Sequence, residues 1–132
     1  MKFMLMMSGS QKGWETGIGT WPEEDIKEHI RFMIRFAGEL KGSGELVSAE
    51  GLDMPNQAKE VRASKTGTPI VSDGPFPESK EFLAGYWIVD VETPKRAYEL
   101  AARVSAAPGR GGAPMNMAVE VRQVMSGPPV EV

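Results

Sequence analysis

Two segments that read as β-strands are apolar at nearly every position, and they limit what the chain can fold into. These are residues 2–7 and residues 86–91. Because successive side chains of a strand point to opposite faces of a sheet, both strands present apolar side chains on both faces. A sheet built on them needs cover on two sides.

Two helices long enough to cover a sheet are predicted. The first spans residues 20–41, with Thr20 and Glu23 at capping-box spacing, and Gly42 or Gly44 ends it. The second begins at Thr93 and Pro94 and stops before Ala107. Their apolar spacing predicts two inward-facing stripes: Ile26, Ile30, Met33, Ile34, Ala37 and Leu40 on the first helix, and Ala97, Leu100, Ala101 and Val104 on the second.

The remaining segments complete an alternating pattern of strands and helices. A Gly-rich surface connection leads to Thr20, strands follow at 45–52 and 117–124, and a hairpin pairs 59–63 with 68–72. Pro77 opens a single helical turn through Phe82, which Gly85 closes. We expect one domain over residues 1–132 with a flexible tail at 126–132. The element order predicts a ferredoxin-like α+β fold, a mostly antiparallel sheet with helices on one face.

Two helices cover only one face of such a sheet. The other face still carries apolar side chains of residues 2–7 and 86–91. A monomer rarely leaves a large apolar sheet face in water, so we expect a homodimer in which the two sheets pack face to face.

Composition excludes several classes of function. Of the 132 residues, 41% are hydrophobic and 25% are charged, and no apolar run reaches the length of a membrane span. A net charge of −3 argues against nucleic acid as a partner. With one histidine and no cysteine the chain lacks the ligands of a usual zinc site, no dinucleotide or phosphate-loop motif is present, and we expect no cofactor. The absence of cysteine fits a cytoplasmic protein.

One loop gathers turn-forming and charged residues more densely than the rest of the chain. It contains Asp73, Gly74, Pro75 and Phe76, followed by Glu78 and Lys80. Asp73 is a candidate general base if a pocket desolvates it. An aspartate before Gly-Pro also accepts backbone N–H bonds in a turn, which lower its pKa, and the sequence favours this structural role.

The residues Asp73 to Phe76 resemble the signature of the YCII-related family of the DGPF type. The similarity extends to the opening KFMLMM, to GELVSAEGL, to AKEVR and to the closing VEVRQV. The resemblance implies a dimeric α/β barrel built from ferredoxin-like units. It also implies a distant relationship to a dehydrochlorinase of chlorinated aromatics that uses a histidine and an aspartate, although the histidine position of that branch corresponds to Met33 here.

His29 is the only histidine and lies at the border of the apolar stripe of the first helix. It is either a half-buried boundary residue or a catalytic partner of Asp73. Trp14, Trp21 and Trp87 are candidates to wall a ligand cavity, although a strand tryptophan such as Trp87 is more often core or dimer interface.

Two hypotheses of function follow. In the first, a pocket between the first helix, the sheet and the signature loop binds or transforms a small organic molecule by acid/base chemistry. Asp73 and His29 are its candidate catalytic residues, and Gly74, Pro75, Phe76, Glu78, Lys80 and Tyr86 form the pocket or signature. In the second, the protein is a non-catalytic regulatory or interaction module. The resemblance adds a setting for it, because some relatives are encoded beside extracytoplasmic-function sigma factors.

Overall fold

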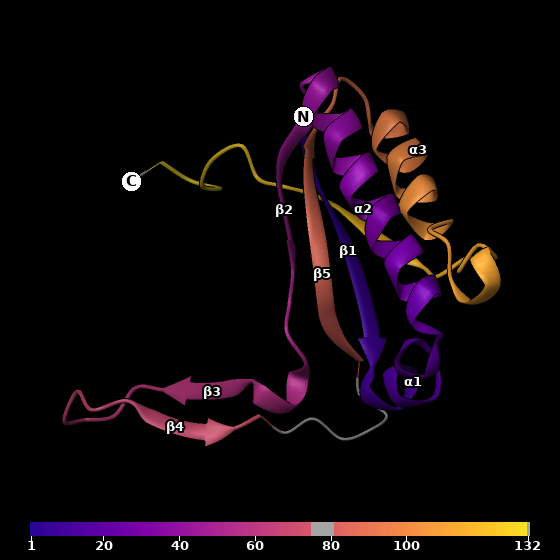
Figure 1. Cartoon of the computed structure of the whole chain (residues 1–132). Helices are drawn as coiled ribbons and strands as arrows, with labels where there is room; N and C mark the ends of the chain where they lie inside the picture. Colours follow the sequence, from indigo (N-terminus) through magenta and orange to yellow (C-terminus); the bar gives the residue numbers. More distant parts are fainter. Residues whose placement is uncertain (75–80, 132) are drawn as a thin grey trace.

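The protein folds around one antiparallel four-stranded sheet. The computed structural model describes residues 1–74 and 81–131. The sheet has the strand order β2-β5-β1-β6, and α2 and α3 cover one of its faces (Figure 1). The expected α+β fold with helices on one face is therefore confirmed, and the sheet of the described chain is open, with β2 and β6 at its edges. Its principal elements are β1 (Lys2–Ser10), α2 (Glu23–Ser43), β2 (Leu46–Gly51), β5 (Glu81–Asp90), α3 (Pro94–Ser105) and β6 (Val119–Gln123).

The core lies between the sheet and the two helices. Strand alternation sends Phe3 and Leu5 of β1, and Trp87 and Val89 of β5, to the helix-covered face. The α3 stripe is confirmed, because all four of its predicted residues are buried. Thr93 caps α3 as expected, accepting a hydrogen bond from the Arg96 N–H at 3.3 Å.

The predicted start of the first helix is wrong. α2 begins at Glu23 with Pro22 as its N-cap residue, and no side chain caps it. Thr20 instead belongs to a short 3-10 helix, η1 (Ile18–Thr20), where its hydroxyl donates to the Gly17 carbonyl at 2.7 Å. The hydroxyl is thus engaged before the helix begins. The helix ends as expected at Gly44, whose φ of 78° is the left-handed conformation that glycine favours.

The predicted apolar stripe of α2 is only partly correct. Leu40 is buried, but Ile30 and Ile34 are 49% and 68% exposed. Phe36 takes the central position instead, stacked on Phe32 and edge-on to Trp87. Because each helical residue turns about 100°, Ile34 lies on nearly the opposite side of the helix from Phe36.

Two further expectations need correction. The Gly-rich connection contains a short helix, α1 (Gln11–Thr16), capped by Ser10, whose side chain accepts from the Gly13 N–H at 2.9 Å. Phe82 and Gly85 do not end a helical turn, because both lie inside β5, where they pair with Gly9 and Met7 of β1. The pairing with β1 holds both residues in an extended strand, which explains why no helical turn forms there. The rest of the expected turn falls on residues 75–80, outside the described part.

The predicted hairpin is confirmed as a separate two-stranded sheet. It consists of β3 (Lys59–Arg62) and β4 (Ile70–Asp73), which follow the 3-10 helix η2 (Pro55–Gln57). Figure 1 shows it projecting from the body on the side away from α2 and α3. All eight of its strand residues are exposed.

The helix-free face of the sheet has an apolar centre. Met4 pairs with Ile88 and Met6 with Tyr86 across β1 and β5, and all four side chains are partly buried. On the neighbouring strand β6, Arg122 and Glu120 pair with the two methionines. Among the helices of residues 1–74 and 81–131, none has the length and apolar character needed to span a membrane.

Candidate ligand cavity

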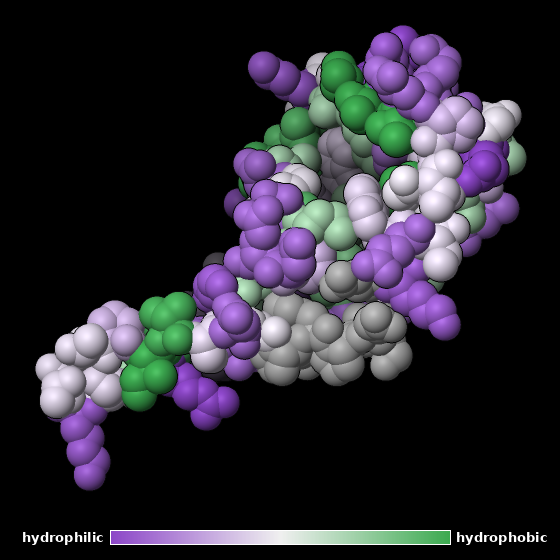
Figure 2. Space-filling view, turned by 60° about the horizontal axis from the view of Figure 1, so that its bottom comes forward, coloured by the Kyte–Doolittle hydropathy of each residue, from purple (hydrophilic) through white to green (hydrophobic). Residues whose placement is uncertain are grey.

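A cavity of about 680 Å³ lies beside α2 between His29 and Ala37. Its walls come from β1, α1, α2, β2, β5 and the segment before β6, and Figure 2 shows the surface hollowed at this end of the molecule. Pockets for small molecules have volumes of about 300–1,000 Å³. The cavity is therefore large enough for a small organic molecule.

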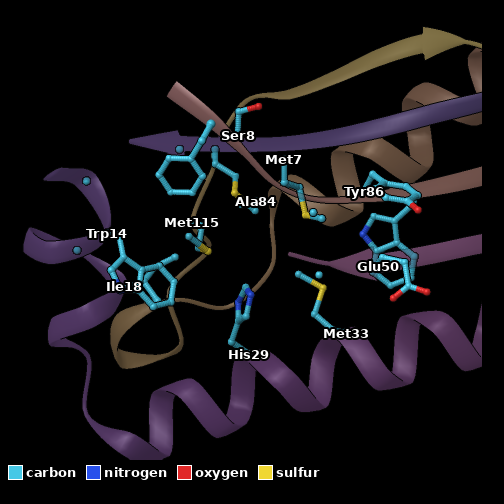
Figure 3. Close-up of a pocket in the computed structure, with 18 of the residues that line it drawn as sticks. Met7, Ser8, Trp14, Ile18, His29, Met33, Glu50, Ala84, Tyr86 and Met115 are labelled. Carbon is cyan, nitrogen blue, oxygen red and sulfur yellow. The ribbon is translucent and has the colours of Figure 1, made fainter. Parts of the chain in front are cut away.

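The cavity walls are largely apolar. Trp14 and Ile18 close it beside α1, and Figure 3 shows Met7, Met33 and Met115 around its centre. Methionine side chains are flexible and polarisable, so such walls adapt to ligands of different outline. The predicted participation of Trp14, Trp21 and Trp87 in a cavity is confirmed, since all three line it.

Small residues leave this space open. Ala37 of α2, Ala49 of β2, and Ala84 and Gly85 of β5 line the cavity where larger side chains fill the core elsewhere. A Cβ added to Gly85 would lie 2.9 Å from the Glu50 carbonyl oxygen and 3.3 Å from the Met7 Cε atom. Gly85 thus allows β2 and β5 to approach closely at the cavity wall.

His29 is the titratable residue best placed in the cavity. Figure 3 shows it rising from α2 toward Met115, and its Nδ1 lies 3.0 Å from the Pro108 carbonyl oxygen. A carbonyl only accepts, so Nδ1 carries the proton, and Nε2 of the neutral ring has a free lone pair. Trp21 packs edge-on against the ring, with centroids 5.8 Å apart. No hydrogen bond to Nε2 is formed by the part of the chain that the structure describes.

Trp87 belongs to both the core and the cavity wall. It is 4% exposed and packs edge-on against Phe36, with ring centroids 5.0 Å apart. Its indole Nε1 is buried and has no hydrogen-bond partner among the described residues. The core position expected for a strand tryptophan is confirmed, together with the cavity position that was its alternative.

Asp73 lies away from this cavity. It ends β4, its carboxylate pairs with the Lys59 ammonium, and its side chain is 89% exposed. The hydrogen bond from Lys59 lowers the pKa of Asp73, which makes the carboxylate a weaker base. Asp73 is not among the described residues that line the cavity, so the structure does not bring it together with His29. Its catalytic role stays a prediction, and so do the backbone N–H bonds of the structural alternative, because the contact seen at the carboxylate is the Lys59 ammonium.

Of the other candidate residues from the sequence, one borders the cavity, one lies in the hairpin, and the rest fall outside the described part of the chain. Tyr86 and its register partner Glu50 border the cavity, although the Tyr86 side chain points to the helix-free face, opposite to Trp87. Gly74 instead donates its N–H to the Ala58 carbonyl at 3.2 Å in the hairpin. Four candidates lie outside the described residues: Pro75, Phe76, Glu78 and Lys80.

Sequence reasoning missed the contribution of the chain after α3. Pro108 orients His29 through its carbonyl, and Met115 and Met117 line the cavity. The sequence of residues 106–114 is rich in proline and glycine, which indicates only a link between the second helix and the last strand. A backbone carbonyl gives no signal in a sequence, but two methionines directly before a strand were visible.

Fold and cavity together define an α+β protein with an apolar ligand-sized cavity and one histidine in its wall. The YCII-related domain matches residues 1–114, and the chain belongs to this family. An uncharacterised protein of Rhizobium meliloti (strain 1021) is 28% identical over 93 residues, which cover 70% of this chain and 74% of that protein.

Proposed function

We propose that the protein binds a small organic molecule in the cavity and transforms it by acid/base chemistry at His29. The observation that carries the proposal is the His29 ring at an apolar cavity, held at Nδ1 by the Pro108 carbonyl and with no hydrogen bond to Nε2 from the described residues. A general base needs a lone pair within reach of the proton it removes, and a fixed ring supplies one.

The surroundings of His29 suit proton transfer. When Nε2 accepts a proton, Nδ1 still donates to the Pro108 carbonyl, so the ring keeps its orientation. Apolar walls offer few competing hydrogen-bond partners to the polar groups of a bound molecule. Glu50 borders the same cavity, and it pairs with Tyr86 across strands β2 and β5. In this proposal Asp73 has a structural role in the hairpin.

A probe of the cavity tests this proposal. N-phenyl-1-naphthylamine is a neutral apolar dye that fluoresces in apolar sites, and we expect one dye to bind each chain. Ala37→Phe places a ring in the cavity and should weaken dye binding at least tenfold. Ala102→Phe, on the exposed side of α3, is the matched control and should leave it unchanged. Equal dye affinity in both variants, with folding intact, would disprove ligand binding in this cavity.

We also propose that the protein forms a homodimer of ferredoxin-like units. The order β2-β5-β1-β6, with α2 and α3 on one face, supports a ferredoxin-like unit. The apolar centre formed by Met4, Met6, Tyr86 and Ile88 supports a cytoplasmic homodimer through the helix-free face, which would complete a dimeric α/β barrel. Sedimentation should show dimers that dissociate on dilution, and a monomer at every concentration would refute the assembly.

A second proposal is a non-catalytic regulatory or interaction module linked to sigma-factor signalling. The hairpin favours it, because Val61, Ile70 and Val71 are more than half exposed there. A protein partner captured by the wild type but lost on Val61→Ser with Val71→Ser would support this alternative. Capture that ignores both substitutions would count against it.

A further inference from the structure

The chemistry of the cavity also restricts the kind of molecule it accepts, and this step rests on the proposed function. We infer that the ligand is uncharged and carries one N–H or O–H donor, which His29 accepts at Nε2. The inference depends on the tautomer of His29 and on the charges of the cavity walls.

The tautomer sets the polarity of the first contact. Because the Pro108 carbonyl at 3.0 Å can only accept, Nδ1–H donates to it and Nε2 is left as an acceptor. An acceptor in the cavity is satisfied by a ligand donor. A ligand that offers only an acceptor, such as an ether oxygen, would leave two lone pairs facing each other.

The described part of the cavity wall offers no positive charge to an anion. The described residues that line it include no lysine and no arginine, and Glu50 adds a negative charge at one side. A carboxylate or phosphate that entered would lose hydration without gaining a counter-charge from these described residues, which is costly in an apolar site. The described walls therefore select against anionic ligands.

The cavity wall holds further polar groups beside His29. Trp14, Trp21 and Trp87 all line it, and an indole N–H only donates; the Trp87 Nε1 is buried and does not present its proton at the cavity surface. The Ser10 hydroxyl already accepts from the Gly13 N–H at 2.9 Å. Figure 3 shows the His29 ring directed into the cavity, and we assign it the role of orienting a bound molecule.

Two isosteric probes test the inference. Indole and benzofuran have nearly the same shape, but only indole has an N–H donor. By calorimetry we expect the wild type to bind indole about three- to tenfold more tightly than benzofuran, the usual effect of one hydrogen bond. His29→Phe should remove this difference and leave benzofuran affinity within about twofold, since it removes one hydrogen bond and keeps a ring.

A second pair of probes, which differ in charge, extends the test. Indole-5-carboxylate should bind at least tenfold more weakly than its neutral methyl ester. Equal binding of indole and benzofuran by the wild type, or tighter binding of the carboxylate, would overturn the inference while leaving the cavity as a binding site. Failure of all these probes and of the dye to bind would overturn the proposed function with it.

A measurement on the wild-type protein covers the case in which His29→Phe fails to fold. The chain has one histidine, so its imidazole ¹⁵N signals need no mutant for assignment. Neutral His29 should show a protonated Nδ1 and a free Nε2, and indole but not benzofuran should shift the Nε2 signal. A protonated Nε2 in the neutral ring would overturn the inference.

Discussion

The helix-covered body and the β3–β4 hairpin use the same kinds of apolar residues with opposite results. Leu5, Val89 and Leu100 are fully buried in the body, whereas Val61, Ile70 and Val71 in the hairpin are 53–61% exposed. Both regions form the hydrogen-bonded ladders that their sequences predict. A strand-forming sequence thus specifies a hydrogen-bonded ladder, but burial requires a second layer, which α2 and α3 supply only to the body.

Ion pairs of the two regions differ in the same way. In the body, Glu45 is 16% exposed and accepts from Arg96 at 2.8 and 3.0 Å. In the hairpin, the side chains of Lys59 and Asp73 are 52% and 89% exposed. Water and salt screen exposed pairs, so the two contacts should differ in their contribution to stability.

The largest effect should come from removing a core ring. Phe36 is buried, contacts the Trp87 and Phe32 rings, and has the Arg103 guanidinium 4.7 Å from its centroid. We expect Phe36→Ala to lower the free energy of unfolding by about 3–5 kcal/mol in urea titrations. Val61→Ala in the hairpin is the matched control, since it opens no cavity, and should cost below about 0.5 kcal/mol. Equal losses would show that the hairpin is packed in solution.

The body ion pair should give an intermediate effect that depends on pH. The hydrogen bond from Arg96 lowers the pKa of Glu45 from 4.5 to about 2. A lowered folded-state pKa stabilises the fold above the unfolded value and loses that contribution as the carboxylate is protonated. We therefore expect stability to fall between pH 4.5 and about 2, by about 1–2 kcal/mol for this partly exposed pair.

Glu45→Gln isolates that contribution. The amide cannot ionise, so the variant should be less stable than the wild type at pH 7 and should approach it near pH 2. Glu39→Gln is a suitable control, because Glu39 pairs with Arg103 at the surface with its side chain 50% exposed. If the two variants show the same pH profile, burial of the Glu45 pair has no energetic consequence.

The sequence predicted the body better where the apolar pattern was unambiguous. In α3, Leu100 and Val104 form a single stripe, and the structure buries both. In α2, apolar residues occupy almost two faces, and the period alone could not show that Phe36 and not Ile34 meets the sheet. Contact with Trp87 settles the choice, and that contact joins residues far apart in sequence.

The site was predictable only in its parts. His29 attracted attention as the only histidine, and the structure places it at the cavity. Its observed partner is the Pro108 carbonyl, and the expected partner Asp73 ends an exposed strand. The cavity draws its walls from segments between Met7 and Met117, so its existence depends on tertiary packing that no local pattern encodes.

The smallest effect should come from the hairpin carboxylate. Asp73→Asn removes the charge that pairs with Lys59 but keeps the size of the side chain. Because the pair is exposed and Asp73 is not among the described cavity residues, the urea midpoint at pH 7 and the affinity for N-phenyl-1-naphthylamine should both stay within experimental error. His29→Gln, which alters the cavity wall, is the comparison for ligand binding.

The kcat of the Asp73→Asn variant decides whether this carboxylate takes part in catalysis. With any substrate that the wild type transforms, His29→Gln should lower kcat at least a hundredfold, the usual contribution of general base catalysis. Asp73→Asn should leave kcat unchanged, since its carboxylate is held by Lys59 on the hairpin. A comparable loss of kcat in a folded Asp73→Asn protein would instead show that the hairpin reaches the reacting molecule during turnover. The aspartate and histidine would then act together, as the catalytic hypothesis from the sequence has it, and the separation between hairpin and body would not persist in the working protein.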